Sequence, residues 1–177
     1  LSHANRLYRP PFYSRLYSVH SQLPDFLINT HSVEDVTDLR NYIARLRGMP
    51  AVLDVAIART RASEAAGIRV PKFQVETIIS SSEKLTSGAP FGPGADAALW
   101  ADVQAKAGAL VKAGKLSQSE ADALLGEART AILDLKPAYG RVIAWAKESL
   151  PTAPSGKVGA VTLPGGLAYY ANELKLN

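Results

Sequence analysis

The sequence predicts an all-α protein: an antiparallel helical array with one long helix kinked at Pro137 and an irregular N-terminal segment. Three observations predict this class. Apolar residues recur at intervals of three and four along several stretches, as on one face of an amphipathic helix. Gly and Pro stand between those stretches, and a helix-capping sequence opens the longest of them. We expect one unit, with an irregular lead-in at 1–31, a helical core at 32–150, and a Gly/Pro turn plus the start of a further helix at 151–177.

The first two predicted helices of the core form an antiparallel hairpin. Ser32 is expected to cap the first helix with its hydroxyl group. The buried stripe of that helix consists of Val36, Leu39, Ile43 and Leu46. Gly48 is expected to end it, Pro50 to lie in the first turn of the second helix, and Gly67 to end the second. Because the link at Gly48 is short, the two helices are expected to run in opposite directions.

The stretch after Pro71 fits two periodicities. Phe73, Val75, Thr77 and Ile79 alternate as they would in a strand, whereas Val75, Ile78, Ile79 and Leu85 follow a helical spacing. We expect a helix, because the neighbouring stretches are helical. A loop rich in Gly and Pro follows at 87–94, and then an Ala-rich helix from about Asp96 to Ala113.

The longest predicted helix begins at the capping box formed by Ser117 and Glu120. Its apolar stripe consists of Leu124, Ala128, Ile132, Leu135, Tyr139, Val142, Ile143 and Ala146. The stripe passes Pro137 without a change of phase, whereas a break in the helix would normally reset the phase. The sequence therefore predicts one helix that is kinked at Pro137, where the hydrogen bond to the Leu133 carbonyl is lost.

Composition and charge exclude several classes of function. The chain has no Cys, which excludes disulfides, thiolate zinc sites and Cys nucleophiles, and its apolar runs are too short for a transmembrane helix. The net charge is +4, and six Arg between Arg40 and Arg69 face only Asp54 and Glu64. We interpret these Arg as a solvated helix face and expect no nucleic-acid partner. The alternative is a non-enzymatic binding module that presents this face to an anionic partner.

No complete active site is visible in the sequence. The three His lack the helical zinc spacing, and no Gly-x-Ser-x-Gly elbow or phosphate loop is present, so we expect no catalytic residue and no metal ligand in this chain. One segment stands out: a tight turn followed directly by two phenols. It consists of Leu163, Pro164, Gly165, Gly166, Tyr169 and Tyr170. Glycine in a turn lets the backbone approach a ligand closely, so these residues are candidates for a substrate-cleft wall; the alternative is a packed surface turn.

Four stretches in register resemble the bacterial domain-of-unknown-function 885 family: Asp38–Leu46, Ala65–Pro71, Lys136–Tyr139 and Gly159–Tyr170. The resemblance covers roughly residues 23–177. One departure is Gly165, because the family usually has Asp or Asn at this point of the turn, so a polar role of that side chain is lost here or supplied otherwise.

The resemblance implies a largely helical, zincin-like parent of several hundred residues, often an exported lipoprotein, with metallopeptidase or related hydrolase activity. Its zinc motif is expected downstream of this chain, so zinc belongs to the parent and no ligand is carried over onto a residue here. The first residue is Leu1 rather than Met, and no helix-stop signal precedes Asn177. We therefore expect an N-terminal fragment of an extracytoplasmic protein, with the C-terminal part of the parent as its partner, a peptide as substrate, and no activity alone.

Overall fold

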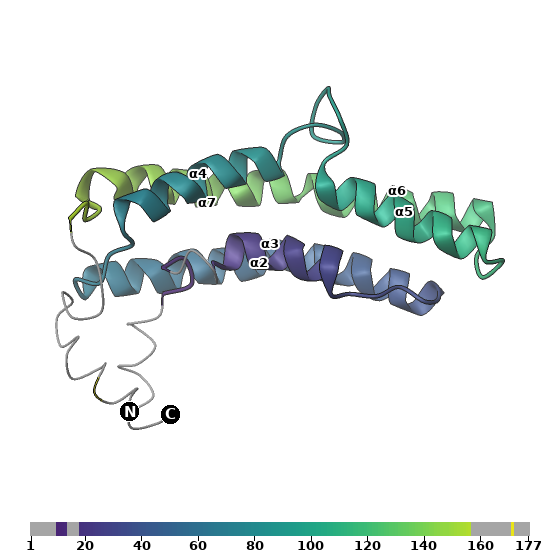
Figure 1. Ribbon diagram of the computed structural model, residues 1–177, viewed down its shortest axis with the longest axis horizontal. Coiled ribbons are helices and arrows are strands. Elements are labelled where there is room, and N and C mark those ends of the chain that lie inside the picture. The colour runs from purple at the N-terminus through teal and green to yellow at the C-terminus, as the bar shows by residue number, and fades with distance from the viewer. Residues whose placement is uncertain (1–9, 14–17, 157–170, 172–177) are drawn as a thin grey trace.

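A computed structural model describes residues 10–13, 18–156 and 171, and these form a two-layered, elongated helical bundle (Figure 1). One layer contains α2 (Val19–Asn29) and the long α3 (Val36–Ala65). The other contains α4 (Lys72–Leu85), α5 (Ala98–Lys112), α6 (Gln118–Leu133) and α7 (Leu135–Ser149), followed by the short 3-10 helix η1 (Leu150–Thr152). No strand occurs within these ranges, which confirms the all-α prediction.

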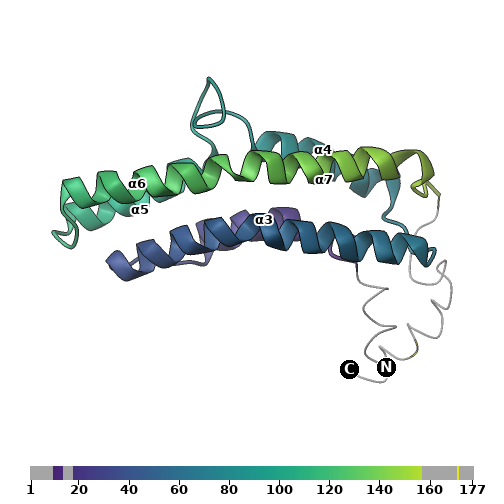
Figure 2. The same ribbon diagram turned by 180° about the vertical axis from the view of Figure 1, so that it is seen from behind.

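Two long elements organise the layers. α3 spans the length of the bundle, and α6 with α7 forms a second rod above it (Figure 2). Ion pairs join Arg47 to Glu127, Asp54 to Arg141 and Arg61 to Glu148, so the pairing advances along both rods in the same direction. The shorter helices run antiparallel to the rod that each one covers: α2 on α3, α4 on α7, and α5 on α6 (Figure 1).

The predicted hairpin at Gly48 is wrong, because α3 is one helix of 30 residues that includes Gly48 and Pro50. Pro50 lacks the N–H group that would bond to the Leu46 carbonyl, a defect that costs about 3 kcal/mol in a helix interior. The buried face nevertheless continues through this point: Leu39, Tyr42, Ile43, Leu46, Met49, Leu53, Ala56 and Thr60 are all buried. Packing of this face against α6 and α7 offsets the lost hydrogen bond.

The start of α3 also differs from the prediction. Asp35, not Ser32, is the N-cap residue, and its Oδ1 atom accepts a hydrogen bond from the Asp38 amide at 3.0 Å. A carboxylate at this position satisfies a free amide and also lies at the positive end of the helix dipole. The end of α3 agrees with the prediction, because Gly67 has a φ of 82° and the Ile68 amide bonds back to the Ser63 carbonyl at 2.9 Å.

The second layer confirms most sequence expectations. α4 is a helix rather than a strand, α5 has nearly the predicted bounds, and the capping box of Ser117 and Glu120 opens α6. α6 and α7 form the predicted long bent helix, interrupted only at Asp134. Pro137 lies in the first turn of α7, where its missing N–H group is best tolerated.

The lead-in at 1–31 is not irregular throughout. Residues 19–29 form α2, which contains the buried Pro24 in its interior. Phe12 lies just before it and stacks on Trp145 of α7, with ring centroids 4.8 Å apart. Both rings are fully buried. Part of the lead-in that was expected to be irregular is therefore packed into the core.

Candidate functional site

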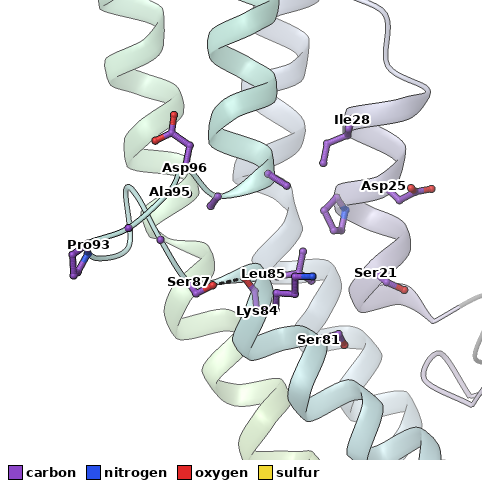
Figure 3. Close-up of a pocket in the computed structure, with 15 residues that line it drawn as sticks. Ser21, Asp25, Ile28, Ser81, Lys84, Leu85, Ser87, Pro93, Ala95 and Asp96 are labelled. Carbon is purple, nitrogen blue, oxygen red and sulfur yellow. Dashed lines mark hydrogen bonds between the residues drawn. The ribbon is translucent and has the colours of Figure 1, made fainter.

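The turn and phenols predicted as a substrate-cleft wall (Leu163–Gly166, Tyr169 and Tyr170) lie outside the described residues. Their role stays a prediction. The described part of the chain contains a different concave feature. A cleft of about 800 Å³ opens between α2, the end of α4, the start of α5 and the loop that joins α4 to α5 (Figure 3).

The loop at 86–97 forms one wall of the cleft and is held in a fixed conformation. The Ala89 amide bonds to the Ala95 carbonyl at 3.0 Å, and the Ala97 amide bonds back to the Ala89 carbonyl at 2.7 Å. Gly88 has a φ of 76°, and a Cβ atom there would lie 2.1 Å from the Ala95 oxygen, so only glycine fits. Lys136 of α7 anchors the loop by donating to the Phe91 carbonyl at 3.1 Å.

Three charged residues line the cleft: Lys84 at the end of α4, Asp25 on α2 and Asp96 in the loop. Within the described residues, the Lys84 ammonium makes no ion pair. Figure 3 shows its side chain extending from α4 into the space before α2. The Asp25 Oδ1 atom accepts from the Asn29 amide at 2.6 Å, and the Asp96 Oδ2 atom accepts from the Gln104 amide at 2.9 Å.

Three hydroxyl groups on the cleft wall donate their protons to the backbone. Ser21 donates to the Ser18 carbonyl at 3.0 Å, Ser81 to the Thr77 carbonyl at 2.6 Å, and Ser87 to the Lys84 carbonyl at 2.8 Å (Figure 3). A hydroxyl group has one proton and two lone pairs. With these protons committed, the three hydroxyls keep only lone pairs for further hydrogen bonds.

Ser81 also belongs to a row of hydrogen-bonded side chains, with His20 and Ser18, that resembles a catalytic triad in its arrangement. The His20 Nε2 atom lies 2.8 Å from the Ser81 Oγ atom, and the Nδ1 atom lies 2.7 Å from the Ser18 Oγ atom. Since the Ser81 hydroxyl also bonds to the Thr77 carbonyl at 2.6 Å, the tautomer in which Nε2 donates to Ser81 and Nδ1 accepts from Ser18 satisfies every group in the row. In a serine nucleophile the hydroxyl must donate to the imidazole instead.

The protonation of His20 supports the same conclusion. Burial lowers the pKa of His20 to about 4, since the charged imidazolium is poorly solvated there. An imidazole with so low a pKa is a weak general base near neutral pH. Ser18 occupies the place that Asp has in a catalytic triad. Its neutral hydroxyl cannot stabilise a positively charged imidazolium as a carboxylate would. This row of hydrogen-bonded side chains is thus a structural link between α2 and α4.

His31 has an equally structural environment. Its Nδ1 atom accepts from the Arg45 guanidinium at 2.6 Å, and its Nε2 atom donates to the Asp38 carbonyl at 3.1 Å. The Arg45 group also lies over the Phe26 ring, 5.2 Å from its centroid. These contacts of His31, Arg45 and Phe26 hold the end of α2 against the first turns of α3.

The Arg between Arg40 and Arg69 do not form one free basic face. Arg47 bonds to Glu127 of α6 and Arg61 to Glu148 of α7. Arg45 bonds to His31, and Arg69 donates to Thr152 at 2.8 Å. These contacts support the interpretation of a solvated, ion-paired surface over an anion-binding surface.

Two features are absent from the described ranges. No cluster of three or more His, Asp or Glu there is arranged to hold a metal ion. No helix there is long and apolar enough to cross a membrane.

Comparison with known proteins then places the chain in a family. The profile described as "Bacterial protein of unknown function (DUF885)" matches residues 4–177. The chain belongs to the DUF885 family. Comparisons of this DUF885 chain with curated proteins and with solved structures gave no significant match. The family resemblance inferred from four short stretches is thereby confirmed, and the match extends from 23–177 to nearly the whole chain.

Sequence reasoning missed the cleft of this DUF885 protein. Its lining comes from four separate stretches, in α2, α4, the loop and α5, so no local sequence motif predicts it. The signal in the sequence is the Gly- and Pro-rich composition of residues 87–94, which predicts a loop but not a cleft. Ordered loops of this length often carry function.

Proposed function

We propose that this chain is the N-terminal scaffold and substrate-cleft wall of a zinc-dependent peptidase or related hydrolase, whose zinc motif lies outside the chain. The observation that carries the proposal is the DUF885 match over residues 4–177, together with the zincin-like character that the family resemblance implies. In this account the two rods are a rigid support, and the turn at 163–166 with Tyr169 and Tyr170 contacts the substrate. An extracytoplasmic location of the parent is part of the same proposal.

The experiment uses the parent protein that extends beyond Asn177. We expect about one equivalent of zinc and peptide hydrolysis that a chelator abolishes and added zinc restores. Tyr169→Phe and Tyr170→Phe remove one phenolic hydroxyl each and are expected to weaken catalysis several-fold without loss of zinc. A parent that holds no zinc and cleaves no peptide would contradict the proposal.

The second function class, a module that binds anions through its Arg-rich face, makes a separate prediction. It requires salt-sensitive retention on heparin that charge reversal at Arg59 and Arg61 abolishes. The ion pair between Arg61 and Glu148 argues against this class. We expect no retention at low salt.

A further inference from the structure

The cleft beside the 86–97 loop receives one charged side chain. Lys84 extends from the end of α4 into the space before α2, whereas the Asp25 and Asp96 carboxylates are directed away from that space (Figure 3). Each carboxylate is held there by a neighbouring side-chain amide. Among the described residues that line the cleft, Lys84 is the only cation, and its ammonium group forms no ion pair with a described carboxylate.

An ammonium group without a partner favours an anionic ligand group. It offers three N–H donors and no acceptor, and its hydrogen bond to a carboxylate is about twice as strong as one between neutral groups. The hydroxyls of Ser21, Ser81 and Ser87 have committed their protons to backbone carbonyls, so they offer no donor to a second anionic group. The polar groups of the cleft therefore suit a ligand with one carboxylate, placed at Lys84.

The rest of the lining is mainly apolar. Pro24 and Ile28 come from α2, Leu85 comes from α4, and Ala97 and Ala98 come from the start of α5. The volume of about 800 Å³ lies within the range of small-molecule sites and is far too small for a folded partner. The loop wall is already ordered by its own hydrogen bonds, so binding does not have to order it. These features suit a ligand with an aliphatic body.

We propose that this cleft binds a small aliphatic monocarboxylate, with the carboxylate at Lys84 and the aliphatic body against α2 and the start of α5. Two sources share this chemistry: a medium-chain fatty acid, and the C-terminal residue of an apolar peptide. The site goes beyond the proposed function and does not depend on it, because it is built from described helices and needs no metal.

The test is a titration of the 177-residue chain with octanoate, followed through backbone amide NMR signals. We expect shifts at the cleft residues that saturate. Octanamide, which lacks the charge, should bind about three- to fivefold more weakly, the upper range for one exposed ion pair. Hexanoate should bind about three- to tenfold more weakly than octanoate, because each methylene removed from water contributes up to about fourfold.

N-acetyl-leucine separates the two sources, because it presents a carboxylate and an aliphatic side chain as a peptide C-terminus does. Binding tighter than that of octanoate assigns the site to a peptide C-terminus. Saturable but weaker binding assigns it to a fatty acid. Both results keep the carboxylate at Lys84.

Two variants locate the ligand. Lys84→Gln should lower the affinity for octanoate to that for octanamide and leave the affinity for octanamide unchanged. Ala98→Phe places a ring on the cleft lining and should weaken both ligands about tenfold. The matched controls Lys112→Gln and Ala101→Phe change exposed residues of α5 that do not line the cleft, and neither should change binding.

The dispersion of the amide spectrum shows whether each variant is folded. Three results would overturn the proposal: equal binding of octanoate and octanamide, binding of octylammonium as tight as that of octanoate, or no saturable shift at the cleft.

Discussion

The buried imidazole of His20 makes the stability of the fold depend on pH in a way that can be calculated. Its pKa falls from 6.5 to about 4 on burial. Because the folded pKa is lower than the unfolded one, the unfolded chain takes up a proton first as the pH falls. The stabilisation is therefore complete above the unfolded pKa of 6.5 and is lost progressively towards pH 4.

The size of the effect follows from the two pKa values. The full shift corresponds to about 3.4 kcal/mol, since one pKa unit is worth about 1.36 kcal/mol. Between about pH 7.5 and about pH 4.5 the expected loss from this one group is about 2.5 kcal/mol. That is a large fraction of the total stability of an ordinary domain.

The assay is denaturant unfolding at both pH values for the wild-type chain and for His20→Gln, whose neutral amide can still donate to Ser81. Carboxylates titrate in the same range, but they do so equally in both proteins and cancel in the difference. The wild type should lose about 2.5 kcal/mol more than the variant. Equal losses, or an NMR titration of the His20 ring near 6.5, would refute the reasoning.

Three further substitutions test local claims by denaturant unfolding. Gly88→Ala should lower the free energy of unfolding by roughly 2 kcal/mol or more, because the new Cβ atom meets the Ala95 oxygen; an unchanged value would show that the loop rearranges freely. Pro50→Ala should raise it by about 1 to 2 kcal/mol by restoring the bond to the Leu46 carbonyl, and a decrease would contradict the cost assigned to Pro50. Ser117→Ala should lower it by about 1 kcal/mol, and no loss would mean that the capping box contributes nothing.

The two internal prolines show where the sequence reasoning succeeded and where it failed. At Pro137 the apolar stripe continues across the proline, and the predicted long bent helix is present, with its interruption at Asp134. At Pro50 the local signals of Gly48 and Pro50 predict a break, although Leu46, Met49 and Leu53 keep the same phase. Tertiary packing along the whole of α3 decides the outcome, because burial of a continuous apolar face stabilises the helix more than one proline destabilises it.

The cleft was not predictable for a different reason. A local sequence pattern predicts one helix or loop at a time. The cleft depends instead on how α2 crosses α4 and on where the 86–97 loop folds back. α2 extends over most of a stretch expected to be irregular, where His20 and Pro24 interrupt the apolar periodicity. The burial of His20 depends in part on distant partners: Ser81 bonds to its ring, and Tyr139 donates to its carbonyl at 2.6 Å.

Purified material of this 177-residue chain offers the sharpest test, through its zinc content by elemental analysis measured alongside peptide hydrolysis. If the helices only support and shape a site completed elsewhere, zinc should stay below about one-tenth of an equivalent after dialysis and no peptide should be cleaved. One equivalent of tightly held zinc, or turnover that survives rigorous purification, would contradict that account.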